Sequence, residues 1–183
     1  NIIKVPLEES SWQLDVDKIK EYYKKDTPQM MFLCYPNNPT GNYFDEDQVM
    51  ELINDFNGIV AIDEAYFEFG GKSFVNLLAD YPHVVIIRTF SKLFSMAGLR
   101  VGYALGHEEL MYELTKVKLP YNVSLFSQIA AIEILKETKW IQDLKKEIIT
   151  SREELKRELS KIPGIRIYPS STNFFLCELE KSR

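Results

Sequence analysis

The stretch VVIIRTFSKLFSMAGLRVG, residues 84–102, decides the fold of this chain. It opens with an apolar run of β-branched residues, which predicts a buried strand. A polar loop follows, and it carries Lys92 close to Phe90 and Leu93. Lysine is rarely found away from water, so a lysine in such surroundings needs a partner or a task. The stretch therefore predicts a strand whose carboxyl end carries chemistry.

Outward from this stretch, apolar strand runs alternate with helical stretches. The strand runs are residues 29–35, 58–63, 83–89 and 101–106, and the expected helices are residues 45–56, 73–81, 107–118 and 124–138. Asp45 begins the first of these helices, and Gln48 follows three residues later, as in a capping box. Continuous apolar strands joined by helices are typical of a parallel or mostly parallel sheet that is covered on both faces. We therefore expect an α/β fold.

A smaller second lobe is expected toward the end of the chain. Residues 140–162 predict a long, charged helix with an apolar stripe, and strand-like runs follow at 165–168 and 173–179. A long helix that leads into new strands suggests a bridge between two lobes. We expect residues 1–139 to form part of a large domain. Residues 140–183 are expected to form the interdomain helix and the start of a small C-terminal α+β domain.

Composition and charge exclude several classes of function. The chain has 183 residues, 45% of them hydrophobic, and a formal charge of −5 from mixed acidic and basic residues. No cluster of basic residues predicts binding to nucleic acid. No apolar run approaches the roughly 18 residues of a membrane span. Two cysteines and two histidines without metal-ligand spacing predict no metal site. Reduced thiols in a cytoplasmic protein are expected.

Polar residues follow three of the predicted strands at the point where each strand ends. The segments are PNNPTGN from residue 36, DEAYFEF from residue 63 and TFSKLFSMAGLR from residue 89. Because the carboxyl ends of parallel strands meet at one edge of a sheet, we expect these segments to converge. Together they offer an amide, a carboxylate, a phenol, two hydroxyls, a lysine and an arginine: Asn38, Asp63, Tyr66, Thr89, Ser91, Lys92 and Arg100.

This set of groups suits a cofactor with an aldehyde, a ring nitrogen, a ring oxygen and a phosphate. Pyridoxal 5'-phosphate has all four. A lysine attaches to the aldehyde, and a carboxylate keeps the ring nitrogen protonated. Hydroxyls and an arginine suit the phosphate. Glu64 lies beside Asp63 but alternates to the other side of the extended strand end, so we expect it to be structural.

The motifs NPTG, DEAY and SK…GLR.G, in this order, resemble those of fold-type I pyridoxal-phosphate-dependent aminotransferases of class I/II. The whole line from YPNNPTGN to GLRVGYALG most resembles histidinol-phosphate aminotransferases. The resemblance implies a three-layer αβα large domain, a cytoplasmic homodimer, and amine or amino-acid and 2-oxo acid substrates. It implies transfer of the amino group of histidinol phosphate to 2-oxoglutarate in histidine biosynthesis.

The resemblance also implies a role for each candidate residue. Asn38 and Tyr66 match the ring-oxygen ligands, and Asp63 matches the partner of the ring nitrogen. Lys92 matches the covalent attachment and proton-transfer residue. The phosphate ligands are matched by Thr89, Ser91 and Arg100. Two further residues, Tyr121 and Asn173, suit either substrate binding or packing.

Other functions stay open at this stage. Threonine-phosphate decarboxylases share these motifs, and aromatic amino-acid aminotransferases share much of the scaffold. A more remote alternative is the aminotransferase-like effector domain of a transcription regulator. The chain opens without methionine on a strand-like run, residues 1–7, so we expect a fragment of a longer protein. The family's N-terminal segment and its carboxylate-binding arginine are then missing, and we expect the fragment alone to be inactive.

Overall fold

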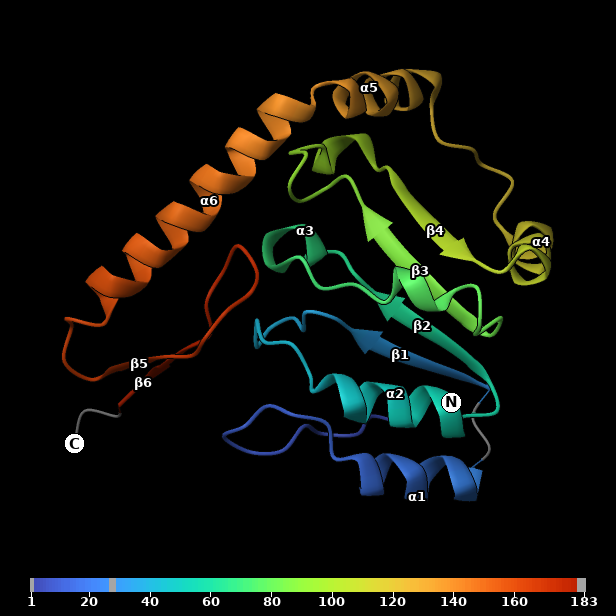
Figure 1. The fold of residues 1–183 in the computed structure, drawn as a ribbon, viewed down its shortest axis with the longest axis horizontal. Coiled ribbons are helices and arrows are strands. Elements are labelled where there is room, and N and C mark those ends of the chain that lie inside the picture. The colour runs from blue at the N-terminus through green and yellow to red at the C-terminus, as the bar shows by residue number, and fades with distance from the viewer. Residues whose placement is uncertain (1, 27–28, 181–183) are drawn as a thin grey trace.

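A four-stranded sheet forms the centre of the computed structural model, which describes residues 2–26 and 29–180 (Figure 1). Its strands lie in the order β1 (Met30–Cys34), β2 (Ile59–Asp63), β3 (Val84–Thr89) and β4 (Gly102–Gly106). The first three are parallel, and β4 pairs antiparallel with β3. The expected α/β class with a mostly parallel sheet is confirmed. β4 runs the other way because residues 90–101 form only loop and one 3-10 turn, too short for the crossover helix that a parallel neighbour requires.

One face of the sheet is covered by α1 (Val16–Asp26) and α2 (Glu46–Asp55), which lie side by side in Figure 1. Alternate side chains of the strands point toward these helices, since successive residues of a strand face opposite ways. The core between the layers is built from buried apolar residues: Leu14, Leu33, Tyr35, Phe44, Val49, Leu52, Ile53, Phe56, Val60, Ile62, Phe74, Val84 and Ile86. The Asp45 carboxylate accepts hydrogen bonds from the backbone amides of Asp47 and Gln48, so it caps α2 as predicted.

The opposite face of the sheet is open in the described part of the chain. Phe32 of β1 is 67% exposed, and Met30 and Ile87 are also exposed on this face. Within the described residues, helices therefore cover one face of the sheet only, as part of the expected layered fold. α4 (Glu108–Val117) packs at β4, and α5 (Leu125–Lys136) leads away toward α6 with most of its apolar side chains exposed.

Several local predictions are wrong. Residues 2–8 are irregular rather than a strand, although Leu7 packs against the core. The helix expected at 73–81 is only a 3-10 turn, η1 (Val75–Leu77). Two short elements were not expected at all, α3 (Phe67–Gly70) and η2 (Ala97–Leu99).

A long helix, α6 (Thr138–Leu159), joins this sheet to a small antiparallel pair of strands, β5 (Ile165–Ile167) and β6 (Cys177–Leu179) (Figure 1). The N-terminal half of its apolar stripe, Ile141, Leu144 and Ile148, packs against a cluster of Tyr66, Phe69 and Leu93. α6 therefore rests on the segments that follow β2 and β3. No helix in the described residues is both long and apolar enough to cross a membrane.

Candidate active site

The three polar segments follow β1, β2 and β3, which are neighbours in the sheet and run the same way. Their carboxyl ends therefore meet at one edge, as the parallel arrangement predicts. In Figure 1 this edge faces α3 and α6. All seven candidate residues lie in these segments.

Tyr66 lies at the centre of the candidate site. Its hydroxyl accepts a hydrogen bond from Asn38 Nδ2 at 3.3 Å, and Lys92 Nζ lies 4.8 Å from the centroid of its ring. The ring is buried, and Phe174 packs against it edge-on with centroids 5.2 Å apart. The loops after β1, β2 and β3 thus each place one predicted residue at this phenol ring.

Asp63 is the last residue of β2 and lies between Cys34 of β1 and Ile87 of β3. Its Oδ1 accepts a hydrogen bond from the amide of Ala65 at 3.0 Å, which orients the carboxylate at the end of the strand. Burial and, next, the nearby charge of Asp63 raise the pKa of the Cys34 thiol. Cys34 therefore stays protonated at neutral pH, and Asp63 supplies the negative charge at this point of the edge.

The two predicted phosphate hydroxyls lie together. Thr89 Oγ1 accepts a hydrogen bond from the Ser91 amide at 3.0 Å and lies 2.9 Å from Ser91 Oγ. It also lies 3.3 Å from the carbonyl oxygen of Val101. This contact draws the end of the long loop back to the end of β3.

The structure does not bring Arg100 into contact with these hydroxyls. Its backbone is left-handed, with φ 55°, and its exposed guanidinium donates from Nη1 to the carbonyl of Ala97 at 3.0 Å. Within the described part of the chain no hydrogen bond links Arg100 to Thr89 or Ser91. A bound phosphate would lie between them and accept hydrogen bonds from the hydroxyls and from the guanidinium.

Nevertheless, the donors fit the cofactor expected from the sequence. An amide and a phenol share a hydrogen bond, a lysine amine lies over the same phenol ring, and a carboxylate ends the neighbouring strand. Two hydroxyls lie just before the lysine, and an exposed arginine lies after it in the same segment. These groups match the ring oxygen, the aldehyde, the ring nitrogen and the phosphate of pyridoxal phosphate.

Sequence reasoning missed Phe174, which contacts Tyr66 from a segment far along the chain. It named Asn173 instead, which is exposed and, with Phe174 and Phe175, lines a surface hollow of about 350 Å³ beside α6. Tyr121 is 86% exposed and shows no contact with the site. The expectation for Glu64 is confirmed, because its side chain is fully buried and ion-paired with Arg88 on the other side of the strand from Asp63.

Residues 1–182 match the family model for aminotransferase class I and II. A curated histidinol-phosphate aminotransferase of Thermoanaerobacter pseudethanolicus is 41% identical over 97% of this chain and 51% of its own length. The chain thus spans about half the length of the curated relatives it matches.

Solved structures of similar proteins have the same fold. The histidinol-phosphate aminotransferase of Clostridium acetobutylicum superposes with a TM-score of 0.86 at 31% identity, over 96% of this chain and 54% of that one. That of Sinorhizobium meliloti, solved in complex with pyridoxal-5'-phosphate, superposes with a TM-score of 0.88 at 25% identity, over 99% of this chain and 50% of that one.

Proposed function

We propose that this chain, which belongs to the class I and II aminotransferase family, is part of a pyridoxal-phosphate-dependent histidinol-phosphate aminotransferase. The whole protein would move the amino group of histidinol phosphate to 2-oxoglutarate, giving imidazole acetol phosphate and glutamate. The observation that carries the proposal is the meeting of Asn38, Tyr66 and Lys92 at one edge of the sheet, beside the Asp63 carboxylate. The identity of 41% to a curated histidinol-phosphate aminotransferase supports the choice of substrate.

Lys92 has the central role in this mechanism. When bound, pyridoxal phosphate supplies an electron sink for the carbon–hydrogen bond that is broken. Lys92 Nζ would bind the aldehyde carbon of the cofactor. Once freed by the incoming amine, Nζ would take the proton from the substrate carbon as general base and deliver it to the cofactor carbon as general acid. The Tyr66 ring, whose centroid lies 4.8 Å from Nζ, keeps the lysine side chain at this position.

The other residues bind and orient. The Asp63 carboxylate, held by the Ala65 amide, stabilises a proton on the ring nitrogen. The Tyr66 hydroxyl and the Asn38 amide bind the ring oxygen together, since their hydrogen bond already places them side by side. Thr89, Ser91 and Arg100 bind the phosphate, the arginine by moving away from the carbonyl of Ala97.

The proposal extends to the organisation of the whole protein. Residues 1–139 would be part of a large cofactor-binding domain, and residues 140–183 would be the interdomain helix with the start of a small domain. α6, which leads from the sheet to the β5–β6 pair, supports this division, and the chain's match to only about half of each relative supports a longer enzyme. We further propose a homodimer in the cytoplasm that acts on amino-acid or amine donors and 2-oxo acids.

The test is a transamination assay with the whole protein. Purified protein loaded with pyridoxal phosphate is given histidinol phosphate and 2-oxoglutarate, and glutamate is measured. We expect glutamate with the native protein and none with Lys92→Ala. Absence of glutamate in the native reaction contradicts the proposal, and release of carbon dioxide from threonine phosphate would instead assign the decarboxylase function.

A further inference from the structure

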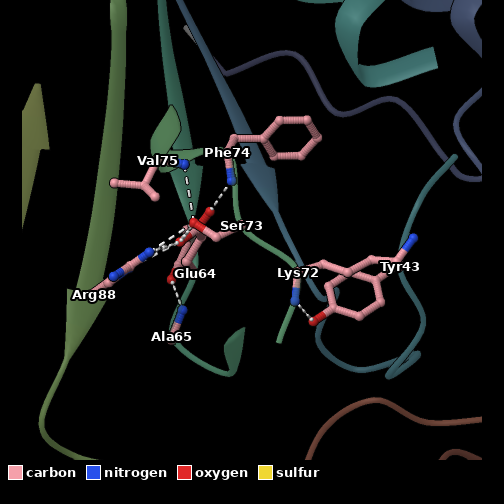
Figure 2. Close-up of polar contacts among 9 residues, drawn as sticks. Tyr43, Glu64, Ala65, Lys72, Ser73, Phe74, Val75 and Arg88 are labelled. Carbon is pink, nitrogen blue, oxygen red and sulfur yellow. Dashed lines mark hydrogen bonds and ion pairs between the residues drawn. The ribbon is translucent and has the colours of Figure 1, made fainter. Parts of the chain in front are cut away.

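A buried ion pair links Arg88 of β3 to Glu64, the residue that follows β2 (Figure 2). Arg88 donates to Glu64 Oε2 through Nε at 3.0 Å and through Nη2 at 2.8 Å. The Glu64 side chain is 0% exposed and that of Arg88 is 11% exposed. Neither residue has a part in the function proposed above, and the pair is the most buried ion pair of the described residues.

Neighbouring groups hold both members of this pair in place. Glu64 Oε1 accepts the amide of Phe74 at 2.8 Å, and Oε2 also accepts the hydroxyl of Ser73 at 2.9 Å. Arg88 Nη2 donates to the same Ser73 hydroxyl at 2.8 Å. The guanidinium carbon lies 3.6 Å from the centroid of the Phe67 ring, so the fork is stacked as well as hydrogen-bonded. The geometry of the pair is therefore closely fixed.

The pair continues the sheet by one step beyond its last paired residues. Asp63 and Ile87 are the last partners of β2 and β3, and the Glu64 amide donates to the Ile87 carbonyl at 2.8 Å. The next positions along the two strands are Glu64 and Arg88, and there the side chains make the connection. Beyond the backbone bond from Glu64 to Ile87, these side chains are what connects the two strand ends.

The position matters because the neighbouring residues belong to the candidate site. Asp63 precedes Glu64, Thr89 follows Arg88, and alternation along a strand points these neighbours to the opposite side. The ion pair thus lies on the core side of the sheet, with Ser73 and Phe74, while Asp63 and Thr89 lie on the side of the site. A shift of the pair would move both site residues with it.

We propose that Glu64 and Arg88 are positioning residues, which set the separation of the Asp63 carboxylate from the Thr89 hydroxyl and so match it to the distance between the ring nitrogen and the phosphate of the cofactor. This inference rests on the proposed function. A buried ion pair adds little net stability over apolar residues of similar size, because removing two charges from water is costly. A fixed geometry, with two guanidinium donors on Glu64 Oε2, is what it provides that an apolar pair does not.

The experiment uses the whole protein and reads the cofactor rather than the reaction. Protein loaded with pyridoxal phosphate is titrated with acid and base while its visible absorption is followed, and the dissociation constant of the cofactor is measured by equilibrium dialysis. The matched variants are Glu64→Gln, which keeps the size of the side chain, and Ser73→Ala, which removes one shared hydroxyl. Ser73→Ala keeps the test valid if Glu64→Gln does not fold.

The expected result is a shift in the midpoint of the absorption titration, together with weaker binding of the cofactor. If Asp63 is displaced, the ring nitrogen is less well protonated, and the nitrogen that links lysine and cofactor keeps its proton to higher pH. We expect the midpoint to rise by about half a pH unit in Glu64→Gln and less in Ser73→Ala. We expect the dissociation constant to rise about tenfold, the lower end of what is seen when the hydrogen-bond partners of metal ligands are removed.

Two controls separate this role from general stability and from the proposed function. Leu52→Ala removes a fully buried side chain of α2 and should lower the melting temperature without moving the midpoint. Asp63→Asn should move the midpoint further than Glu64→Gln. Suppose that Glu64→Gln and Ser73→Ala melt earlier but titrate like the native protein, while the midpoint of Asp63→Asn is shifted. That result overturns the positioning role and leaves the proposed function standing. A native protein that takes up no cofactor overturns the proposed function and this inference with it.

Discussion

Replacing Gly41 by alanine should loosen the contact between the Asn38 loop and the C-terminal lobe. Gly41 is buried with φ +77°, and its carbonyl accepts the amide of Ser171 at 2.7 Å. A Cβ at this position would lie 2.7 Å from Ser170 Oγ and 3.0 Å from Ser170 Cβ. The new methyl group therefore requires both a left-handed alanine and a movement of Ser170.

The chain offers a matched control for the backbone part of this cost. Gly71 also has a left-handed backbone, with φ +83°, but a Cβ there meets nothing within 4 Å. Both alanine variants carry about 1–2 kcal/mol of backbone strain. Only Gly41→Ala adds the overpacking term, typically about 1–3 kcal/mol. The difference between the two variants therefore measures the contact with Ser170.

The assay is thermal unfolding of the whole protein, followed by circular dichroism. We expect Gly41→Ala to melt a few degrees below Gly71→Ala, at roughly 1–2 °C per kcal/mol for a protein about twice as long as this chain. In a double-mutant cycle with Ser170→Gly, most of this extra loss should disappear, because the residue that blocks the methyl group is gone. Equal melting temperatures for the two alanine variants, or no coupling to Ser170, would refute the reasoning.

Two further predictions concern the residues around Tyr66 and α3. Tyr66→Phe keeps the ring contact with Phe174 but removes the hydroxyl bonded to Asn38, so kcat should fall about tenfold with little change in melting temperature; an unchanged kcat contradicts the role of the hydroxyl. Burial raises the pKa of Glu68 to about 7 from 4.5, against the opposing effects of its own backbone amide, Arg88 and Lys145. Since this pKa is raised in the folded state, the stability it contributes is present below about pH 4.5 and is lost as the pH rises through 7. Glu68→Gln should therefore raise the unfolding free energy at pH 8, by at most about 3 kcal/mol, and leave it unchanged at pH 4. If the unfolding free energies of variant and native protein change in parallel with pH, Glu68 is not the group responsible.

The sheet and the meeting of its loops could be predicted because both follow from local patterns. The apolar runs of β1, β2 and β3 are continuous, and parallel strands bring their carboxyl ends together whatever the details of packing. α1 was missed although it carries signals of its own. Asp15 accepts the amide of Lys18 near its start, and Val16, Ile19 and Tyr23 form its apolar side. That stripe is short and lies among lysines and acidic residues, so it is weaker than the strand runs.

Other features depend on contacts that the sequence does not signal locally. Arg100 lies in the loop expected for a phosphate ligand, but its left-handed backbone turns the guanidinium to the carbonyl of Ala97. Phe174 reaches Tyr66 only because α6 folds back over α3 and the loop after β3. Each of these depends on how distant segments pack, whereas Asn38, Tyr66 and Lys92 depend on strand order alone.

The central claim, that Lys92 is the residue that holds the cofactor, is tested most directly by trapping the attachment. The whole protein is loaded with pyridoxal phosphate, reduced with borohydride, digested and mapped by mass spectrometry. We predict that the added mass lies on the peptide that contains Lys92, and that Lys92→Ala carries none. Label on a different lysine, or equal labelling of the native and Lys92→Ala proteins, would contradict the account.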